Sequence, residues 1–127
     1  MDNIIKIALD YKNKYGDIKK LLQYLNVKIT YCYLENIKAC TVENIIFLSE
    51  NIEDYEKDFV IAHELGHIIL HDKEIRRFSK IETFKGSREE TEANLFATVF
   101  LGYRYNDVYT NDIQRIVNNI YCTYLNK

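Results

Sequence analysis

The stretch FVIAHELGHIILH, residues 59 to 71, contains every histidine of this chain and most strongly constrains its fold. Residues four apart project from one face of an α-helix, so His63 and His67 can direct two imidazole nitrogens at one point. The surrounding residues are apolar at helical spacing, which predicts a largely buried helix from about Asp54 to His71. We therefore expect a helix that holds a metal ion inside a folded domain.

The residue after the first histidine is a glutamate, which suits metal-assisted hydrolysis. A catalytic zinc site has three protein ligands and keeps one position for water. Glu64 lies about 100° around the helix from His63, where its carboxylate can reach that water without binding the metal. We expect Glu64 to act as a general base that takes the proton, so that the hydroxide attacks a peptide carbonyl. Alternatively, both histidines are hydrogen-bonded core residues and Glu64 lies at the surface.

The third histidine is poorly placed to complete such a site. On a straight helix His71 lies about 12 Å along the axis from His63, too far for both to bind one zinc ion. The extended motif HExxHxxGxxH has a helix-breaking glycine and a later histidine, where this chain has Leu70 and Lys73. We expect His71 to lie at the helix end or to support a metal ligand from behind.

A carboxylate is therefore the expected third ligand, and the segment after Gly86 offers several. A helical projection centred on Phe96 turns Glu89 and Glu92 towards the buried face and Glu90 away from it. A carboxylate on a buried face needs a partner, and a zinc ion is a strong one. Spacing alone does not choose between Glu89 and Glu92.

Periodicity organises the remainder of the chain. Helical spacing of apolar residues alternates with a stretch of period two, and a charged segment at 72–87 is predicted to be a loop. We expect helices at 3–14, 18–25, 88–101 and about 110–125, and strands at 27–31, in KACTV and in IIFLS. The sequence thus predicts one α+β domain over residues 1–127, with a three-stranded antiparallel sheet packed on the HExxH helix.

Charge and composition argue against several classes of partner. The formal net charge is −2 and the lysines are scattered, so direct binding to nucleic acid is not expected, although 3–14 and 18–25 could be mistaken for a helix-turn-helix. No stretch approaches the roughly 20 apolar residues of a membrane span. Three cysteines and no secretory signal fit reduced thiols, so we expect a cytoplasmic protein.

Two motifs together are more informative than either alone. FVIAHELGHIILH followed by ETEANLFATVFL resembles the ImmA/IrrE family of bacterial and phage metallopeptidases, over about residues 55 to 101. The resemblance implies a zincin-like fold, with His63 and His67 as zinc ligands and Glu64 as the catalytic base. It also implies Glu92, the glutamate of EAN, as the third ligand.

The same resemblance implies a zinc-dependent endopeptidase that cleaves a helix-turn-helix repressor of a phage or mobile element. One alternative is a zinc-stabilised module that binds a repressor, or a toxin or antitoxin partner, without proteolysis. Another is a hydrolase of a small molecule or single amide. For the peptidase, we expect the substrate to run along IIFLS as an edge strand beside the metal.

Overall fold

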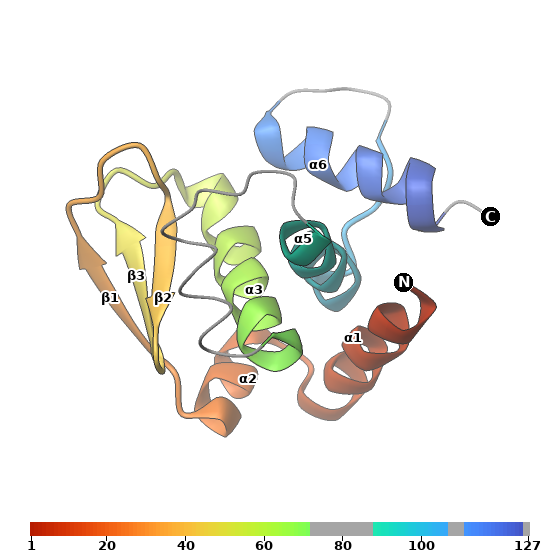
Figure 1. The fold of residues 1–127 in the computed structure, drawn as a ribbon, viewed down its shortest axis with the longest axis horizontal. Helices are drawn as coiled ribbons and strands as arrows, with labels where there is room; N and C mark the ends of the chain where they lie inside the picture. The colour runs from red at the N-terminus through yellow and green to blue at the C-terminus, as the bar shows by residue number, and fades with distance from the viewer. Residues whose placement is uncertain (72–87, 107–110, 126–127) are drawn as a thin grey trace.

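The computed structural model describes residues 1–71, 88–106 and 111–125, and the loop predicted at 72–87 lies outside them. Helices and strands fall close to their predicted positions (Figure 1). In chain order they are α1 (Asp2–Tyr15), α2 (Ile18–Leu25), β1 (Lys28–Cys32), β2 (Ala39–Val42), β3 (Ile45–Ser49), α3 (Asp54–Leu70), α5 (Arg88–Leu101) and α6 (Asp112–Ile120), which continues as a π-helix (Tyr121–Leu125).

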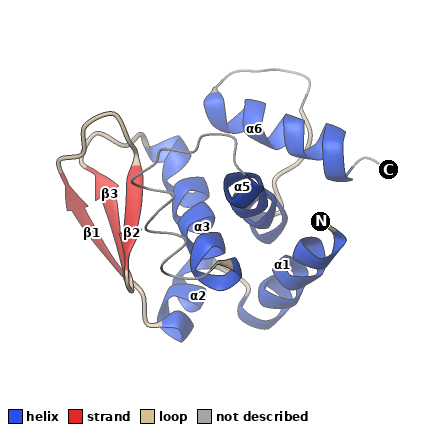
Figure 2. Ribbon diagram, in the orientation of Figure 1, coloured by secondary structure: helices blue, strands red, loops and turns tan. Residues whose placement is uncertain are grey.

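The elements form layers around α3, in the α+β arrangement that the sequence predicts. The sheet lies on one side of α3, with β2 in contact with the helix, and α5 lies on the other side (Figure 2). Helices α1 and α6 then pack on α5. Among the described helices, none combines the length and the apolar character that a membrane span requires.

The sheet differs from the antiparallel one predicted. Its strand order is β1-β3-β2, with β2 antiparallel to β3 but β1 parallel to β3. A two-residue turn at 43–44 joins β2 to β3 as a tight hairpin, whereas the six residues 33–38 let the chain pass from β1 to the far side of β3. The most apolar strand, IIFLS, thereby takes the centre of the sheet, so it cannot be the open edge that we expected.

Local sequence explains where the short second helix begins and ends. The Asp17 side chain accepts a hydrogen bond from the backbone N–H of Lys20 at 2.8 Å, which satisfies one free donor of the first turn. Asn26 ends the helix in the left-handed conformation, with φ of 55°. Together the two residues set the path of the chain into β1.

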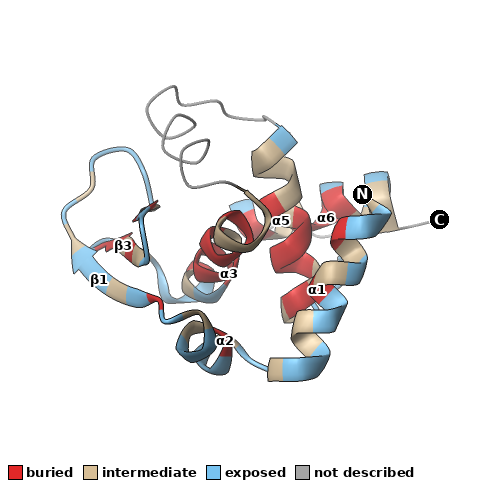
Figure 3. Ribbon diagram, turned by 60° about the horizontal axis from the view of Figure 1, so that its bottom comes forward, coloured by how far each residue is buried: buried red, intermediate tan, exposed pale blue. Residues whose placement is uncertain are grey.

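The main core lies between α3 and α5, where Figure 3 shows buried residues on the facing sides of both helices. Gly66 permits their close approach. A Cβ at this position would lie 3.2 Å from the Cβ of Phe96 and 3.3 Å from the Cα and carbonyl oxygen of Ala93. The glycine of HELGH therefore brings α5, with its acidic first turn, against the histidine helix.

Candidate metal centre

Helix α3 presents two histidines on one face, as their spacing predicts. The Nε2 atoms of His63 and His67 lie 3.2 Å apart, and the two rings are nearly perpendicular, at 85°. His67 is 1% exposed, and the side chain of His63 is 13% exposed. The two imidazoles thus direct nitrogen atoms at one partly buried point.

Glu90, in the first turn of α5, completes this cluster. Its Oε2 lies 3.1 Å from Nε2 of His63, and its Oε1 lies 2.7 Å from Nε2 of His67. One ligand atom from each of the three residues can be chosen so that all lie within 4.8 Å of one another. In a tetrahedral zinc site with bonds of about 2.0–2.2 Å, ligand atoms lie roughly 3.3 Å apart. The three side chains therefore fit a zinc ion in both chemistry and spacing.

The cluster contains Glu90 where we expected Glu92, and Glu89 is not part of it either. The helical projection took the centre of the buried face of α5 as the side that faces the histidines. That face packs on α1 as well as on α3, so its centre does not give the direction of His63 and His67. The ring of Phe96 lies against Tyr11 of α1, with centroids 6.2 Å apart. Phe96 therefore packs between α1 and Gly66 of α3, and it does not mark the direction in which His63 and His67 lie.

A second residue of α5, Asn94, supports the cluster and was missed in the sequence. Its Oδ1 lies 2.7 Å from Nδ1 of His63, so in the tautomer with its proton on Nδ1 this N–H donates to Asn94 and Nε2 keeps a lone pair for a metal ion. Glu90 and Asn94 are four residues apart, the same spacing as His63 and His67. Other polar residues of α5, such as Arg88 and Glu92, share this spacing, so the spacing alone does not identify the pair.

Glu64 is buried, which contradicts the alternative in which it lies at the surface. It is 3% exposed, and its Oε1 accepts a hydrogen bond of 2.5 Å from the hydroxyl of Thr41. Thr41 is 1% exposed and belongs to β2, the strand in contact with α3. The sheet thus holds the carboxylate of Glu64 beside the histidine pair, a contact that no sequence pattern indicated.

Burial and hydrogen bonding shift the pKa values of two members of the cluster. Burial lowers the pKa of His67 below its ordinary value, although the hydrogen bond with Glu90 opposes this shift. Burial raises the pKa of Glu90, but the hydrogen bonds with His63 and His67 lower it by more, and the result is well below the ordinary value. Both shifts favour a neutral imidazole and an ionised carboxylate, the forms that bind a metal.

Glu92 and His71 contact each other next to the cluster. Nε2 of His71 lies 2.8 Å from Oε1 of Glu92, whose other oxygen lies 3.2 Å from Nε of Arg88. On its other side, Nδ1 of His71 lies 2.9 Å from Nδ1 of His67. His71 therefore lies behind a member of the cluster, one of the two roles expected for it.

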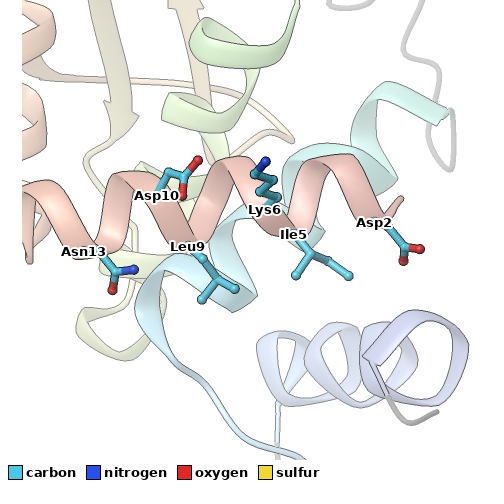
Figure 4. A pocket seen from close by; sticks show the side chains of 6 residues that line it. All are labelled: Asp2, Ile5, Lys6, Leu9, Asp10 and Asn13. Carbon is cyan, nitrogen blue, oxygen red and sulfur yellow. The ribbon is translucent and has the colours of Figure 1, made fainter.

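A hollow on α1 is unrelated to this centre (Figure 4). The residues that line it all belong to α1, and none is a histidine or cysteine: Asp2, Ile5, Lys6, Leu9, Asp10 and Asn13. Successive turns of one helix form this hollow, and we assign no chemistry to it.

The chain is similar to one protein family and to a phage protein. The family model Peptidase M78, described as an IrrE N-terminal-like domain, matches residues 8–101. "Uncharacterized immunity region protein 2" of Bacillus phage phi105 is 31% identical over 96 residues, which cover 71% of this chain. The aligned region spans 61% of the length of that relative. No solved structure matches the chain.

Proposed function

We propose that this chain, which belongs to the Peptidase M78 family of IrrE N-terminal-like domains, is a zinc-dependent endopeptidase with a zincin-like site. The family membership that the two motifs predicted is confirmed. The observation that carries the proposal is the convergence of His63, His67 and Glu90 on one point, beside a buried carboxylate. His63, His67 and Glu90 are the proposed metal ligands, and Glu64 is the proposed general base.

Each side chain has a defined task in this mechanism. When bound, zinc supplies Lewis acidity, which makes a water molecule more acidic and polarises the carbonyl group of the substrate. The carboxylate of Glu64 accepts the proton of the attacking water and later donates it to the leaving amine. The Thr41 hydroxyl holds one oxygen of that carboxylate, and Asn94 holds the His63 ring in place.

The substrate is proposed to bind along β2 and not along IIFLS. Among the residues that the structure describes, no strand pairs with the outer edge of β2, whereas β3 is paired on both sides. An extended peptide can add to such an edge through backbone hydrogen bonds. Since Thr41 of β2 contacts Glu64, a peptide paired with this strand would lie close to the proposed base.

The proposed substrate is an intracellular protein, such as a helix-turn-helix repressor of a phage or mobile element. The similarity to a protein named for the immunity region of a phage supports this substrate class. A zinc-stabilised module that binds such a repressor without cutting it is the second candidate. The burial of Glu64 favours the peptidase, because a purely structural zinc site does not require a buried base.

Cleavage of a repressor encoded beside this gene would test the activity. The zinc-loaded chain is expected to convert the purified repressor into two fragments, detected by mass spectrometry. Glu64→Gln is expected to bind one zinc per chain but to release no fragments, because the proton acceptor is lost. Glu50→Gln removes a carboxylate at an exposed position and serves as the matched control. Tight binding of an intact repressor, equal for wild type and Glu64→Gln, would instead favour the binding module.

Zinc content would test the third ligand. Glu90→Gln is expected to lose stoichiometric zinc, measured by mass spectrometry under native conditions, because one of three protein ligands is removed. Glu92→Gln is expected to retain it, with lower affinity, because Glu92 contacts His71 and not the two Nε2 atoms. The reverse pattern would return the ligand role to Glu92, as the sequence motif implies.

A further inference from the structure

We infer that His71 and Glu92 are positioning residues, which hold His67 as a metal ligand through a chain of two hydrogen bonds. This inference rests on the zinc site proposed above and deepens it. The chain runs from Nδ1 of His67 to Nδ1 of His71 at 2.9 Å, and from Nε2 of His71 to Oε1 of Glu92 at 2.8 Å. A fixed ring orientation is what a ligand needs to keep its nitrogen aimed at a metal.

The protonation of each ring follows from the chemistry of imidazole. A neutral imidazole has one protonated nitrogen, so a metal on Nε2 of His67 requires the proton to be on Nδ1. That N–H donates to Nδ1 of His71, which must therefore accept. His71 then has its proton on Nε2, and this N–H donates to the carboxylate of Glu92. With this assignment, each of the two hydrogen bonds has one donor and one acceptor.

The end of α3 directs the His71 ring back towards the cluster. The backbone N–H of His71 still donates to the carbonyl of His67, at 3.0 Å, but its φ and ψ of −124° and 150° are no longer helical. The side chain is only 8% exposed. A histidine that merely capped the helix through its charge would gain from solvent and from protonation, whereas this ring is buried between two partners.

Glu92 connects this series of hydrogen bonds to the surface of the protein. Its side chain is 15% exposed, and its second oxygen accepts a hydrogen bond from the Arg88 guanidinium, which is 81% exposed. The carboxylate thus keeps a charged partner while it accepts the N–H of His71. A carboxylate that accepts the N–H of an imidazole makes the other nitrogen of that imidazole a better electron donor. Here the carboxylate of Glu92 acts on His71, and His71 in turn acts on the proposed ligand His67.

Nitrogen NMR of the zinc-loaded chain would test the inference without a variant. The chain has only three histidines, so three imidazole patterns are expected. His63 and His67 are expected to carry their proton on Nδ1, and His71 on Nε2, the opposite tautomer. A protonated imidazolium at His71, or its proton on Nδ1, would overturn the inference.

Zinc affinity gives a second and independent readout. His71→Leu removes the acceptor and is expected to weaken zinc binding by about 10- to 100-fold, measured by competition with a chromogenic chelator. His71→Gln retains an acceptor oxygen and is expected to recover much of the loss. Glu50→Gln is expected to match wild type. Equal affinity of His71→Leu and wild type would overturn the inference.

The proposed peptidase activity and the positioning role of His71 can be overturned separately. A wild-type chain that binds no zinc overturns both the proposed function and this inference. A chain that binds zinc with His71 in the expected tautomer, but does not cleave the repressor, overturns only the peptidase activity. A chain that binds zinc and cleaves the repressor, with affinity unchanged in His71→Leu, overturns only the positioning role.

Discussion

At the residue scale, the hydrogen bond between Thr41 and Glu64 affects both the stability of the fold and the proposed proton transfer. A carboxylate that is 3% exposed has lost most of its hydration, and the hydroxyl of Thr41 supplies a hydrogen bond in its place. The same bond limits the directions in which the carboxylate can point. Thr41 is therefore expected to matter both for folding and for proton transfer.

Replacing Thr41 with valine removes the hydroxyl and keeps the shape of the side chain. The free energy of unfolding is expected to fall by about 1–3 kcal/mol, because a buried carboxylate loses a hydrogen bond. Urea denaturation of the metal-free protein would measure this change. Thr41→Ser keeps the hydroxyl and is expected to lose less. An equal loss in Thr41→Ser and Thr41→Val would show that the hydroxyl does not account for the effect.

The sequence predicted His63, Glu64 and His67 at this scale because they share one helix with a fixed period. It did not predict Glu90, Asn94 or Thr41, because their positions depend on how other elements pack against that helix. A helical projection gives the angle between residues of α5. It does not give the direction in which α3 lies, which the contact with α1 also determines.

At the scale of elements, the site depends on the close contact between α3 and α5. The third proposed ligand is on α5, and the Cα and carbonyl oxygen of Ala93 lie 3.3 Å from the position that a Cβ at Gly66 would take. These are backbone atoms, so they cannot be displaced by a change of rotamer. The spacing of the two helices, and hence the position of Glu90, is set at this glycine.

Gly66→Ala is expected to push the helices apart and to weaken zinc binding. The added methyl group meets backbone atoms at 3.3 Å, and such overpacking costs about 1–3 kcal/mol, which exceeds the helix propensity gained over glycine. Chelator competition and urea denaturation would measure both effects. Gly16→Ala is the matched control: its φ of 86° is strained for alanine, but nothing lies within 4 Å. It should lower stability and leave zinc affinity unchanged.

Most elements were predictable because their signals are local. Asp17 and Asn26 mark the ends of α2, and the period of two marks the strands. The pairing of β1 with β3 was not predictable, because a six-residue connection permits either neighbour and the choice depends on which strand is best buried at the centre. The antiparallel prediction held only for the two strands that a tight turn joins.

At the scale of the whole molecule, the metal-free protein is expected to be sensitive to acid. Burial lowers the pKa of His67 below the ordinary value of 6.5, so the unfolded chain takes up this proton at a higher pH than the folded chain. Stability is therefore lost as the pH falls below about 6.5. Glu90, whose pKa is also lowered overall, contributes stability above its ordinary value of 4.5 that is lost below it.

Urea denaturation in EDTA between pH 8 and pH 5 would measure this dependence. The free energy of unfolding is expected to decrease as the pH is lowered through 6.5, and His67→Gln is expected to show a shallower decrease. A stability that is constant over this range, or that rises on acidification, would contradict the proton linkage of His67.

The two-residue turn between β2 and β3 has a consequence for how this chain can vary. Alternate residues of a strand point to opposite faces, so a shift of one residue in β2 would replace Thr41 behind Glu64 with Cys40 or Val42. Substitutions at Glu43 and Asn44 preserve the length of the turn, whereas an insertion or deletion changes it. Functional relatives should therefore keep the length of this turn.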